Sequence, residues 1–208
     1  REGTRSDDNA FDPDHFPLAQ EIVLFLLNRA EPEELQFEDL LTSVLNTQQG
    51  HVFNAAMHLS LRCARVSQDK GGKEWLSPIQ EHFTNRLTGP DRTTEFSVTL
   101  GKYLPYLNYL DPKWVRDHID DIFPVDKDSR WLPTMEAYLF RTTKVHKRLS
   151  TLLRRNGSYK KALWADFTNE ASKNRVVQHA AVAYIQGPES VQDPGSLLRS
   201  ILDRRSPR

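Results

Sequence analysis

The chain has 208 residues, of which 38% are hydrophobic and 10% aromatic, enough to form the core of one large domain or two small ones. Lysine and arginine number 28, as do aspartate and glutamate, so the net charge is zero and no global field attracts the chain to nucleic acid or an anionic membrane. The single cysteine, Cys63, excludes an internal disulfide framework and a cysteine-rich zinc site, and it is typical of a reducing compartment, so we expect a cytoplasmic protein.

No stretch has the roughly 18 to 20 consecutive apolar residues that a membrane span requires; the most apolar run covers only residues 22–27. We therefore expect no membrane partner. The chain begins with Arg1, and the basic-then-apolar pattern of a signal peptide is missing from its start. We interpret the chain as a segment cut from a longer polypeptide.

The sequence divides into a short lead-in and one long helical part. Residues 1–15 are polar and rich in aspartate, which indicates a flexible lead-in. Residues 16–205 carry apolar side chains at steps of three and four, and we interpret them as a single helical-repeat domain or segment. The predicted helices cover residues 18–29, 35–45, 52–66, 75–87, 96–107, 114–123, 131–141, 144–155, 158–171, 173–186 and 196–204.

Turn signals separate these helices. Asp111-Pro112 indicates a helix start, because the aspartate accepts amide hydrogens of the first turn and proline presets its backbone. Gly71-Gly72, Asn156-Gly157 and Gly187-Pro188 indicate stops. No run outside the helices alternates with a period of two, so no sheet is predicted. About eleven short helices indicate an all-α fold, and they disfavour a four-helix bundle. We expect an irregular α-solenoid of stacked helix pairs of the HEAT or TPR kind, with an irregular helical domain as the alternative because the pairs share little sequence identity.

Residues 44–59, VLNTQQGHVFNAAMHL, place a polar turn with Gly50 between two apolar runs. His51 and His58 would lie about 10 Å apart along a helix, which is too far to share one metal ion. We interpret both as histidines of a polar face or a helix cap. Gly50 either adopts a conformation that a side chain would strain or permits close helix packing.

Other candidate sites have a simpler structural interpretation. Asp117 and Asp121 could together hold a hard cation, but acidic residues near a helix start also complement its dipole, which we favour. The glycines of residues 69–73 lack the GxxxxGK[ST] pattern of a phosphate loop, and no GxSxG pattern is present. Cys63 lies on an apolar stripe, which predicts a buried, unreactive thiol. We therefore predict no catalytic residue, metal site or cofactor, and no enzyme activity.

The four tryptophans have apolar neighbours at helical spacing and are predicted core anchors: Trp75, Trp114, Trp131 and Trp164.

Residues 141–161, RTTKVHKRLSTLLRRNGSYKK, contain eight lysines or arginines and no acidic residue. On a helix, the apolar side chains would lie on one side and a basic stripe on the other, formed by Lys144, Lys147, Arg148, Arg154 and Arg155. This basic stripe has three interpretations. It is a solvated face opposite the acidic stretch 117–128, or it binds an acidic protein partner, or it contacts nucleic-acid phosphates. The zero net charge and the lack of aromatic residues on the same helix face favour a protein over a nucleic acid.

Short motifs within about residues 18 to 165 carry a likeness to a known family. They are residues 45–50 (LNTQQG) followed by Ala55-Ala56, 99–104 (TLGKYL), 110–115 (LDPKWV), 135–139 (MEAYL) leading to Leu152-Leu153, and 159–163 (YKKAL). Together they resemble the helical-repeat region of large bacterial antiphage defence proteins. In that group an asparagine-and-glycine turn joins a helix pair, a later Asp-Pro-x-Trp opens another helix, and the array follows an effector such as a sirtuin-like NADase or a signal-transducing ATPase.

The resemblance implies a sensor, scaffold or oligomerisation segment, and the phosphate-binding and NAD-binding signatures of the effectors are absent from this sequence. We therefore expect a non-enzymatic protein-interaction or sensing module of a larger cytoplasmic bacterial defence protein, with a phage protein or another copy of itself as its partner. The alternative is a nucleic-acid-binding helical domain that uses the basic stripe within residues 141–161.

Overall fold

The computed structural model describes residues 11–35, 40–69, 75–90, 92–186, 190–193 and 196–205. Within these ranges the chain is helical and contains no strand, so the predicted all-α fold is confirmed. In the same ranges one 3₁₀ helix, η1 (Pro13–His15), precedes twelve α-helices. They are α2 (Phe16–Leu27), α3 (Leu40–Asn46), α4 (Gln48–Asp69), α5 (Ser77–Thr88), α6 (Thr94–Leu110), α7 (Pro112–Asp117), α8 (Ile119–Ile122), α9 (Asp128–Arg141), α10 (Lys147–Arg155), α11 (Ser158–Ala162), α12 (Glu170–Ile185) and α13 (Leu197–Arg205).

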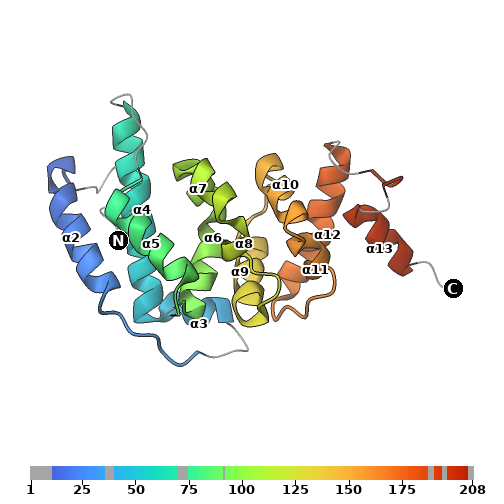
Figure 1. Ribbon diagram of the computed structural model, residues 1–208, viewed down its shortest axis with the longest axis horizontal. Helices are drawn as coiled ribbons and strands as arrows, with labels where there is room; N and C mark the ends of the chain where they lie inside the picture. Colours follow the sequence, from blue (N-terminus) through green and yellow to red (C-terminus); the bar gives the residue numbers. More distant parts are fainter. Residues whose placement is uncertain are drawn as a thin grey trace.

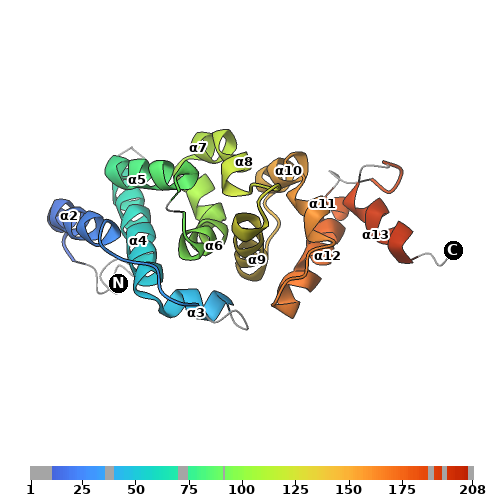
Figure 2. The same ribbon diagram turned by 60° about the horizontal axis from the view of Figure 1, so that its bottom comes forward.

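The helices follow one another along the long axis of the molecule, from α2 at one end to α13 at the other (Figure 1). Contacts join α2 to α4, α4 to α6, α6 to α9, α9 to α12 and α12 to α13, which makes a continuous row. The shorter helices α5, α7, α8 and α10 lie along one side of this row (Figure 2). In its middle, α6 and α9 pack against each other more extensively than any other pair of described helices.

Aromatic side chains join the first helices of the row. The ring centroid of Phe96 on α6 lies 5.1 Å from that of Phe53 on α4 and 5.2 Å from that of Phe83 on α5. All three rings are fully buried. Burial of each ring contributes on the order of 2 to 3 kcal/mol of hydrophobic stabilisation, so this cluster is a main link between the three helices.

Three of the four predicted core tryptophans are buried: Trp75, Trp114 and Trp131. The ring centroids of Trp75 and Trp114 are 5.1 Å apart and nearly perpendicular. The prediction for Trp164 is wrong, because 62% of this residue is exposed. Trp164 lies in a connection and not in the helix predicted over residues 158–171, so no helical stripe carries it into the core.

A buried arginine ties the start of α6 to its neighbours. Arg92 donates to the Ser97 hydroxyl at 3.1 Å, to the Ile122 carbonyl at 2.9 Å, to the Thr134 hydroxyl at 3.2 Å and to the carbonyl of Asp121. Burial lowers the pKa of Arg92 to about 10, with Arg130 as a further cause, so the guanidinium remains charged at neutral pH. These bonds satisfy carbonyls at the end of α8, where short helices leave them without partners.

The predicted helix over residues 114–123 is divided into α7 and α8. Asp111 starts α7 as predicted, since its Oδ1 accepts from the amides of Lys113 and Trp114, both at 2.9 Å. The division falls at His118, whose Nδ1 lies 2.9 Å from the Trp114 carbonyl oxygen. The same carbonyl also accepts from the His118 amide at 3.0 Å, so α7 closes its last turn at this residue and α8 begins after it.

The predicted helix over residues 158–171 ends at Ala162, and residues 163–169 form an irregular connection. Phe167 is buried and stacks on Trp131 with ring centroids 6.2 Å apart. Asn169 then caps α12, because its side chain accepts from the Ala171 amide at 2.9 Å. Packing of Phe167 therefore overrides the helical spacing that the sequence suggested.

The polar turn within residues 44–59 is short, since only Thr47 separates α3 from α4. The Thr47 hydroxyl donates to the Val44 carbonyl at 2.8 Å and accepts from the Gly50 amide at 2.9 Å. A β-carbon on Gly50 would lie 1.9 Å from the Val44 oxygen. Because the only positive φ among the described residues belongs to Gly157, the role of Gly50 is close packing.

Several predicted boundaries differ or lie outside the described residues. The prediction for residues 35–45 was wrong at its start, since α3 begins at Leu40 and Leu35 is not helical; residues 36–39 lie outside the description. The stops at Gly71-Gly72 and Gly187-Pro188 also lie outside it, as do residues 1–10 of the predicted lead-in. Of the rest of the lead-in, residues 13–15 form η1, and Arg62 donates to the Phe11 carbonyl at 2.9 Å.

Candidate functional site

The residues of the predicted basic stripe do not share one helix. The helix predicted over residues 144–155 begins at Lys147, so Lys144 lies in the connection between α9 and α10. The other four members lie on α10: Lys147, Arg148, Arg154 and Arg155. Leu149 and Leu153 are buried on the opposite side of that helix, as the apolar spacing predicted.

The α10 part of the basic stripe ends close to the acidic stretch 117–128, since Asn156, the residue after α10, contacts Asp120. Arg148 donates to the Pro112 carbonyl at 3.2 Å. Two nearby residues outside the stripe contact the acidic stretch: Asn156 donates to Asp120 at 2.7 Å, and Lys161 forms an ion pair with Asp128. Arg154 and Arg155 border a separate hollow of about 320 Å³.

Lys144 belongs to a larger groove of about 810 Å³ between α4, α6 and the connection after α9. We name it the cationic groove. Its walls contain residues from three segments that are far apart in the sequence. The lining residues are His58, Leu61, Arg65, Lys102, Tyr103, Pro105, Tyr106, Tyr109, Arg141, Thr142, Thr143, Lys144 and His146.

The groove gathers positive charge from each of these segments. Arg65 comes from α4, Lys102 from α6, Arg141 from the end of α9, and Lys144 from the connection that follows. None of the described lining residues is an aspartate or a glutamate. Arg141 and Lys144 are exposed and form no ion pair with the described part of the chain. A protein of zero net charge thus has a local concentration of cations at this position.

Three tyrosines from α6 line the same groove at steps of three residues. Tyr103 is buried, whereas Tyr106 is 51% exposed and Tyr109 is 36% exposed. The ring centroids of Tyr103 and Tyr106 are 6.0 Å apart. Since α6 lies at the centre of the row, it offers these rings on a rigid support.

A hydrogen-bond network fixes the floor of the groove. The buried Asn54 accepts through Oδ1 from the Lys102 ammonium at 2.7 Å and from the Tyr103 hydroxyl at 3.0 Å. Because the Tyr103 proton is used in this bond, His58 Nε2, 3.2 Å away, donates to the Tyr103 oxygen. The Lys102 ammonium also lies 4.9 Å from the centroid of the Tyr103 ring. Lysine, tyrosine and histidine are therefore positioned before any ligand binds.

The remaining candidates have structural partners. Asp117 accepts from Lys113 and from Arg116, both at 2.9 Å, and these bonds lower the pKa of its carboxyl group. Cys63 is buried, as predicted. Among the described residues no group of three histidine, cysteine or acidic side chains is arranged to hold a metal ion.

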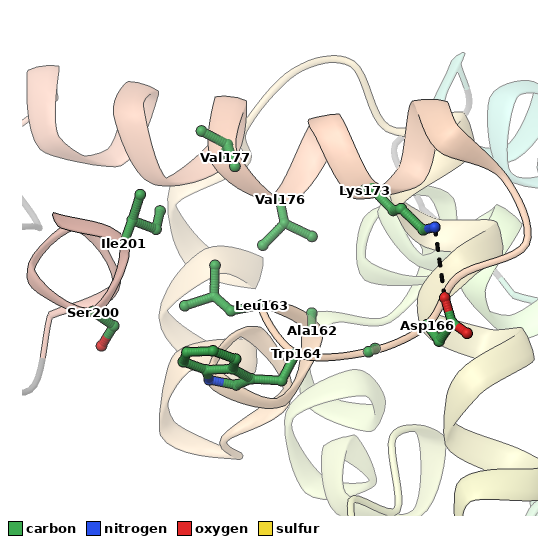
Figure 3. Close-up of a pocket in the computed structure, with 10 residues that line it drawn as sticks. Ala162, Leu163, Trp164, Asp166, Lys173, Val176, Val177, Ser200 and Ile201 are labelled. Atoms are coloured by element: carbon green, nitrogen blue, oxygen red, sulfur yellow. Dashed lines mark ion pairs between the residues drawn. The ribbon is translucent and has the colours of Figure 1, made fainter. Parts of the chain in front are cut away.

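A third hollow, of about 650 Å³, lies near the end of the row, between α12, α13 and the connection after α11 (Figure 3). The exposed ring of Trp164 borders it, together with apolar side chains such as Val176 and Ile201. An ion pair between Lys173 and Asp166, 3.5 Å long, crosses one end of it. Its walls are largely apolar, and Lys173 is paired with Asp166. It therefore presents fewer charged groups to a ligand than the cationic groove does.

Of the five residues predicted to form the basic stripe, Lys144 lines the cationic groove, so the stripe did not predict most of the groove. Arg65, Lys102 and Arg141 lie in three different segments, and no spacing rule brings them together. The signal that was available is the repetition of Tyr103, Tyr106 and Tyr109 at steps of three beside Lys102, although Tyr109 lies just beyond the helix predicted over residues 96–107. His58 was correctly predicted to be a polar residue of the helix, but its contact with Tyr103 depends on how α4 packs against α6.

Comparison with protein-family models, with curated proteins and with solved structures gave no match for this chain. Among the residues that the structure describes, no helix combines the length and the apolar character that crossing a membrane requires.

Proposed function

We propose that this chain is a non-enzymatic interaction module that recognises an anionic partner through the cationic groove. The observation that supports the proposal is the convergence of Arg65, Lys102, Arg141 and Lys144 on one hollow whose described lining contains no carboxylate. Such a site attracts negative charge and holds it by charge-assisted hydrogen bonds. The fixed positions of Lys102 and Tyr103 reduce the entropy that binding costs.

The fold proposed for the module is an irregular α-solenoid of stacked helix pairs, with α4, α6, α9 and α12 as the longer members. In support, the row follows chain order and the shorter helices lie along one side of it (Figures 1 and 2). In a solenoid, surface side chains can vary without disturbing the core, which suits a recognition module.

The larger protein to which the module belongs is proposed to be a cytoplasmic bacterial antiphage defence protein, on the basis of the sequence motifs. Two of these motifs have defined structural roles here: residues 45–50 contain the close approach of Gly50 to Val44, and residues 110–115 contain the Asp111 cap of α7. The partner proposed from the sequence alone is a phage protein or a second copy of the chain.

A nucleic acid is the second candidate partner, and a specific observation favours it. Aromatic residues are lacking beside the basic stripe on its own helix face, which by itself favours a protein partner. Tyr106 and Tyr109 supply exposed aromatic rings next to Lys102, from α6 and not from α10.

Binding of labelled polyanions tests the proposal. Fluorescence anisotropy with a fluorescein-labelled polyglutamate peptide and a labelled oligonucleotide should show binding of at least one of them at about 50 mM salt, weakening toward about 150 mM. The double variant Arg141→Glu, Lys144→Glu should lower that affinity at least about tenfold, because like charges across a contact cost more than a kilocalorie per mole.

The matched control is Lys147→Glu, Arg155→Glu, which makes the same change in net charge on α10, where both residues are exposed. Its affinity should fall less than about threefold, since long-range charge is screened at this salt. A greater loss in this control than in the groove variant would assign the site to the basic stripe instead. Absence of binding to both polyanions would overturn the proposal.

A further inference from the structure

We infer that the cationic groove binds a single strand of nucleic acid, with phosphates on its cations and bases on Tyr106 and Tyr109. This inference rests on the proposed function and names its ligand class. It is carried by the combination of charge and exposed aromatic rings in one hollow.

The cations are placed for a phosphate backbone and not for a single anionic group. Arg65, Lys102 and Arg141 lie on three different helices around the groove, and Lys144 lies on the connection that follows α9. Arginine binds a phosphate through two parallel hydrogen bonds, whereas lysine acts as a point charge. Cations on several walls suit a strand that passes along the groove and presents a phosphate at each nucleotide.

The tyrosines distinguish a nucleic acid from an acidic peptide. Exposed aromatic rings stabilise bases by stacking, a contribution that every base can use and that a glutamate side chain cannot. Tyr106 is 51% exposed and Tyr109 36% exposed beside the cations, although a buried position would gain hydrophobic stabilisation. Tyr103, held by Asn54 and His58, packs near Tyr106 and limits how that ring can turn.

The concave shape of the site favours a single strand over a duplex. Proteins that read a duplex insert a protruding helix or ribbon into its major groove. Here the tyrosines and cations line a hollow of about 810 Å³. Bases inside a duplex are already stacked and cannot reach rings on the wall of a hollow, whereas the bases of a single strand can.

The test uses anisotropy with three probes: a labelled oligothymidylate of about ten nucleotides, a duplex of equal length, and the labelled polyglutamate peptide. We expect the single strand to bind more tightly than the duplex. With four cations, its affinity should fall about twentyfold between about 50 and 150 mM salt, since each neutralised phosphate on a single strand contributes a slope of about 0.7.

Aromatic variants give the decisive readout. Tyr106→Ala with Tyr109→Ala should lower affinity for the oligothymidylate at least about tenfold. Tyr106→Phe with Tyr109→Phe, which keeps both rings, should stay within about threefold of the original chain, because stacking needs the ring and not the hydroxyl. Tyr184→Ala removes an exposed tyrosine of α12 outside the groove and should have no effect. Circular dichroism of each variant establishes that it is folded.

The outcomes separate the inference from the proposed function. Binding of polyglutamate but not of oligothymidylate would overturn the inference and leave the proposed function standing. Binding of neither probe would overturn both. Equal binding of duplex and single strand, or full affinity in the folded double alanine variant, would also overturn the inference, because it would show that phosphates alone are recognised.

Discussion

A β-carbon on Gly101 would lie only 1.9 Å from the carbonyl oxygen of Thr134, so the central helices α6 and α9 meet where one of them has no side chain. The same β-carbon would lie 3.0 Å from the amide nitrogen of Tyr138. Both neighbours are main-chain atoms and cannot rotate away. Glycine is therefore required here by distance, although its backbone conformation is open to other residues.

Gly101→Ala should destabilise the protein by about 3 kcal/mol or more, because the methyl group can fit only if α6 and α9 separate. Urea unfolding followed by circular dichroism measures the change in the free energy of unfolding. Gly157→Ala is the comparison: its φ of 85° is unfavourable for alanine, but nothing lies within 4 Å of the new methyl group. It should cost only about 1 to 2 kcal/mol, and an equal loss in both variants would contradict the packing argument.

Gly50→Ala tests the turn between α3 and α4. The methyl group would overlap the Val44 carbonyl oxygen and crowd the Thr47 hydroxyl that caps the turn. We expect a loss of about 2 to 3 kcal/mol, together with a weaker attachment of α3 that hydrogen exchange of its amides would reveal. His51→Ala, at an exposed neighbouring position, should change stability by less than about 0.5 kcal/mol, and a comparable loss there would point to general sensitivity of the turn.

The sequence predicts the helices of this fold well because their apolar spacing is local information. The start of α7 at Asp111-Pro112 and the burial of Cys63 follow from side-chain chemistry within a few residues. The failures have non-local causes. The break at 163–169 depends on Phe167 packing against Trp131, a residue of another helix. No local pattern predicts that contact.

The candidate site was predicted only in part for the same reason. Lys144 was singled out by the charge of its segment, and it does line the cationic groove. The predicted helix placed it beside Arg148, whereas the helix begins after it and leaves it facing α4 and α6. Arg65 and Lys102 reach the groove through helix packing, which spacing within one segment cannot reveal.

A chain of hydrogen bonds links a buried histidine to two buried tyrosines. His179 Nε2 lies 2.9 Å from the Thr142 carbonyl oxygen, which can only accept, so Nε2 carries the proton. Nδ1 then accepts from the Tyr159 hydroxyl at 2.8 Å, and Tyr159 lies 3.4 Å from the hydroxyl of Tyr138. Burial, the largest cause, lowers the pKa of His179 from 6.5 to about 4, with Arg175 nearby as a further cause. The neutral imidazole is the form that the fold holds.

This pKa predicts how stability depends on pH. Between pH 6.5 and about 4 the unfolded chain binds a proton at His179 that the folded chain does not, so stability falls as the pH falls through this window. The loss from this residue should approach about 3 kcal/mol at the acidic end. It is measured as the free energy of urea unfolding of the original chain and of His179→Gln across the window. The difference between the two should shrink as the pH falls; a constant difference would mean that His179 does not titrate in this range.

Glu136 anchors the irregular connection 163–169, which lies within the helix predicted over residues 158–171. This fully buried residue of α9 accepts through Oε1 from the Thr168 hydroxyl at 2.8 Å and from the Asn169 amide at 2.6 Å. Its other oxygen, Oε2, has no hydrogen-bond partner among the described residues. Oε1 therefore holds the connection that leads into α12. Oε2 is buried without a hydrogen bond that would offset its loss of hydration.

Glu136→Gln and Glu136→Ala should consequently differ in their effects. Glutamine keeps one oxygen that can accept both bonds, so its stability should stay within about 1 kcal/mol of the original chain. Alanine removes the acceptor and leaves a cavity, so it should cost about 3 kcal/mol and increase hydrogen exchange or proteolysis within residues 163–169. Glu170→Gln, at an exposed position beside the same connection, controls for the change of charge. Equal losses for glutamine and alanine would show that the charge of Glu136, and not its acceptor oxygen, holds the connection in place.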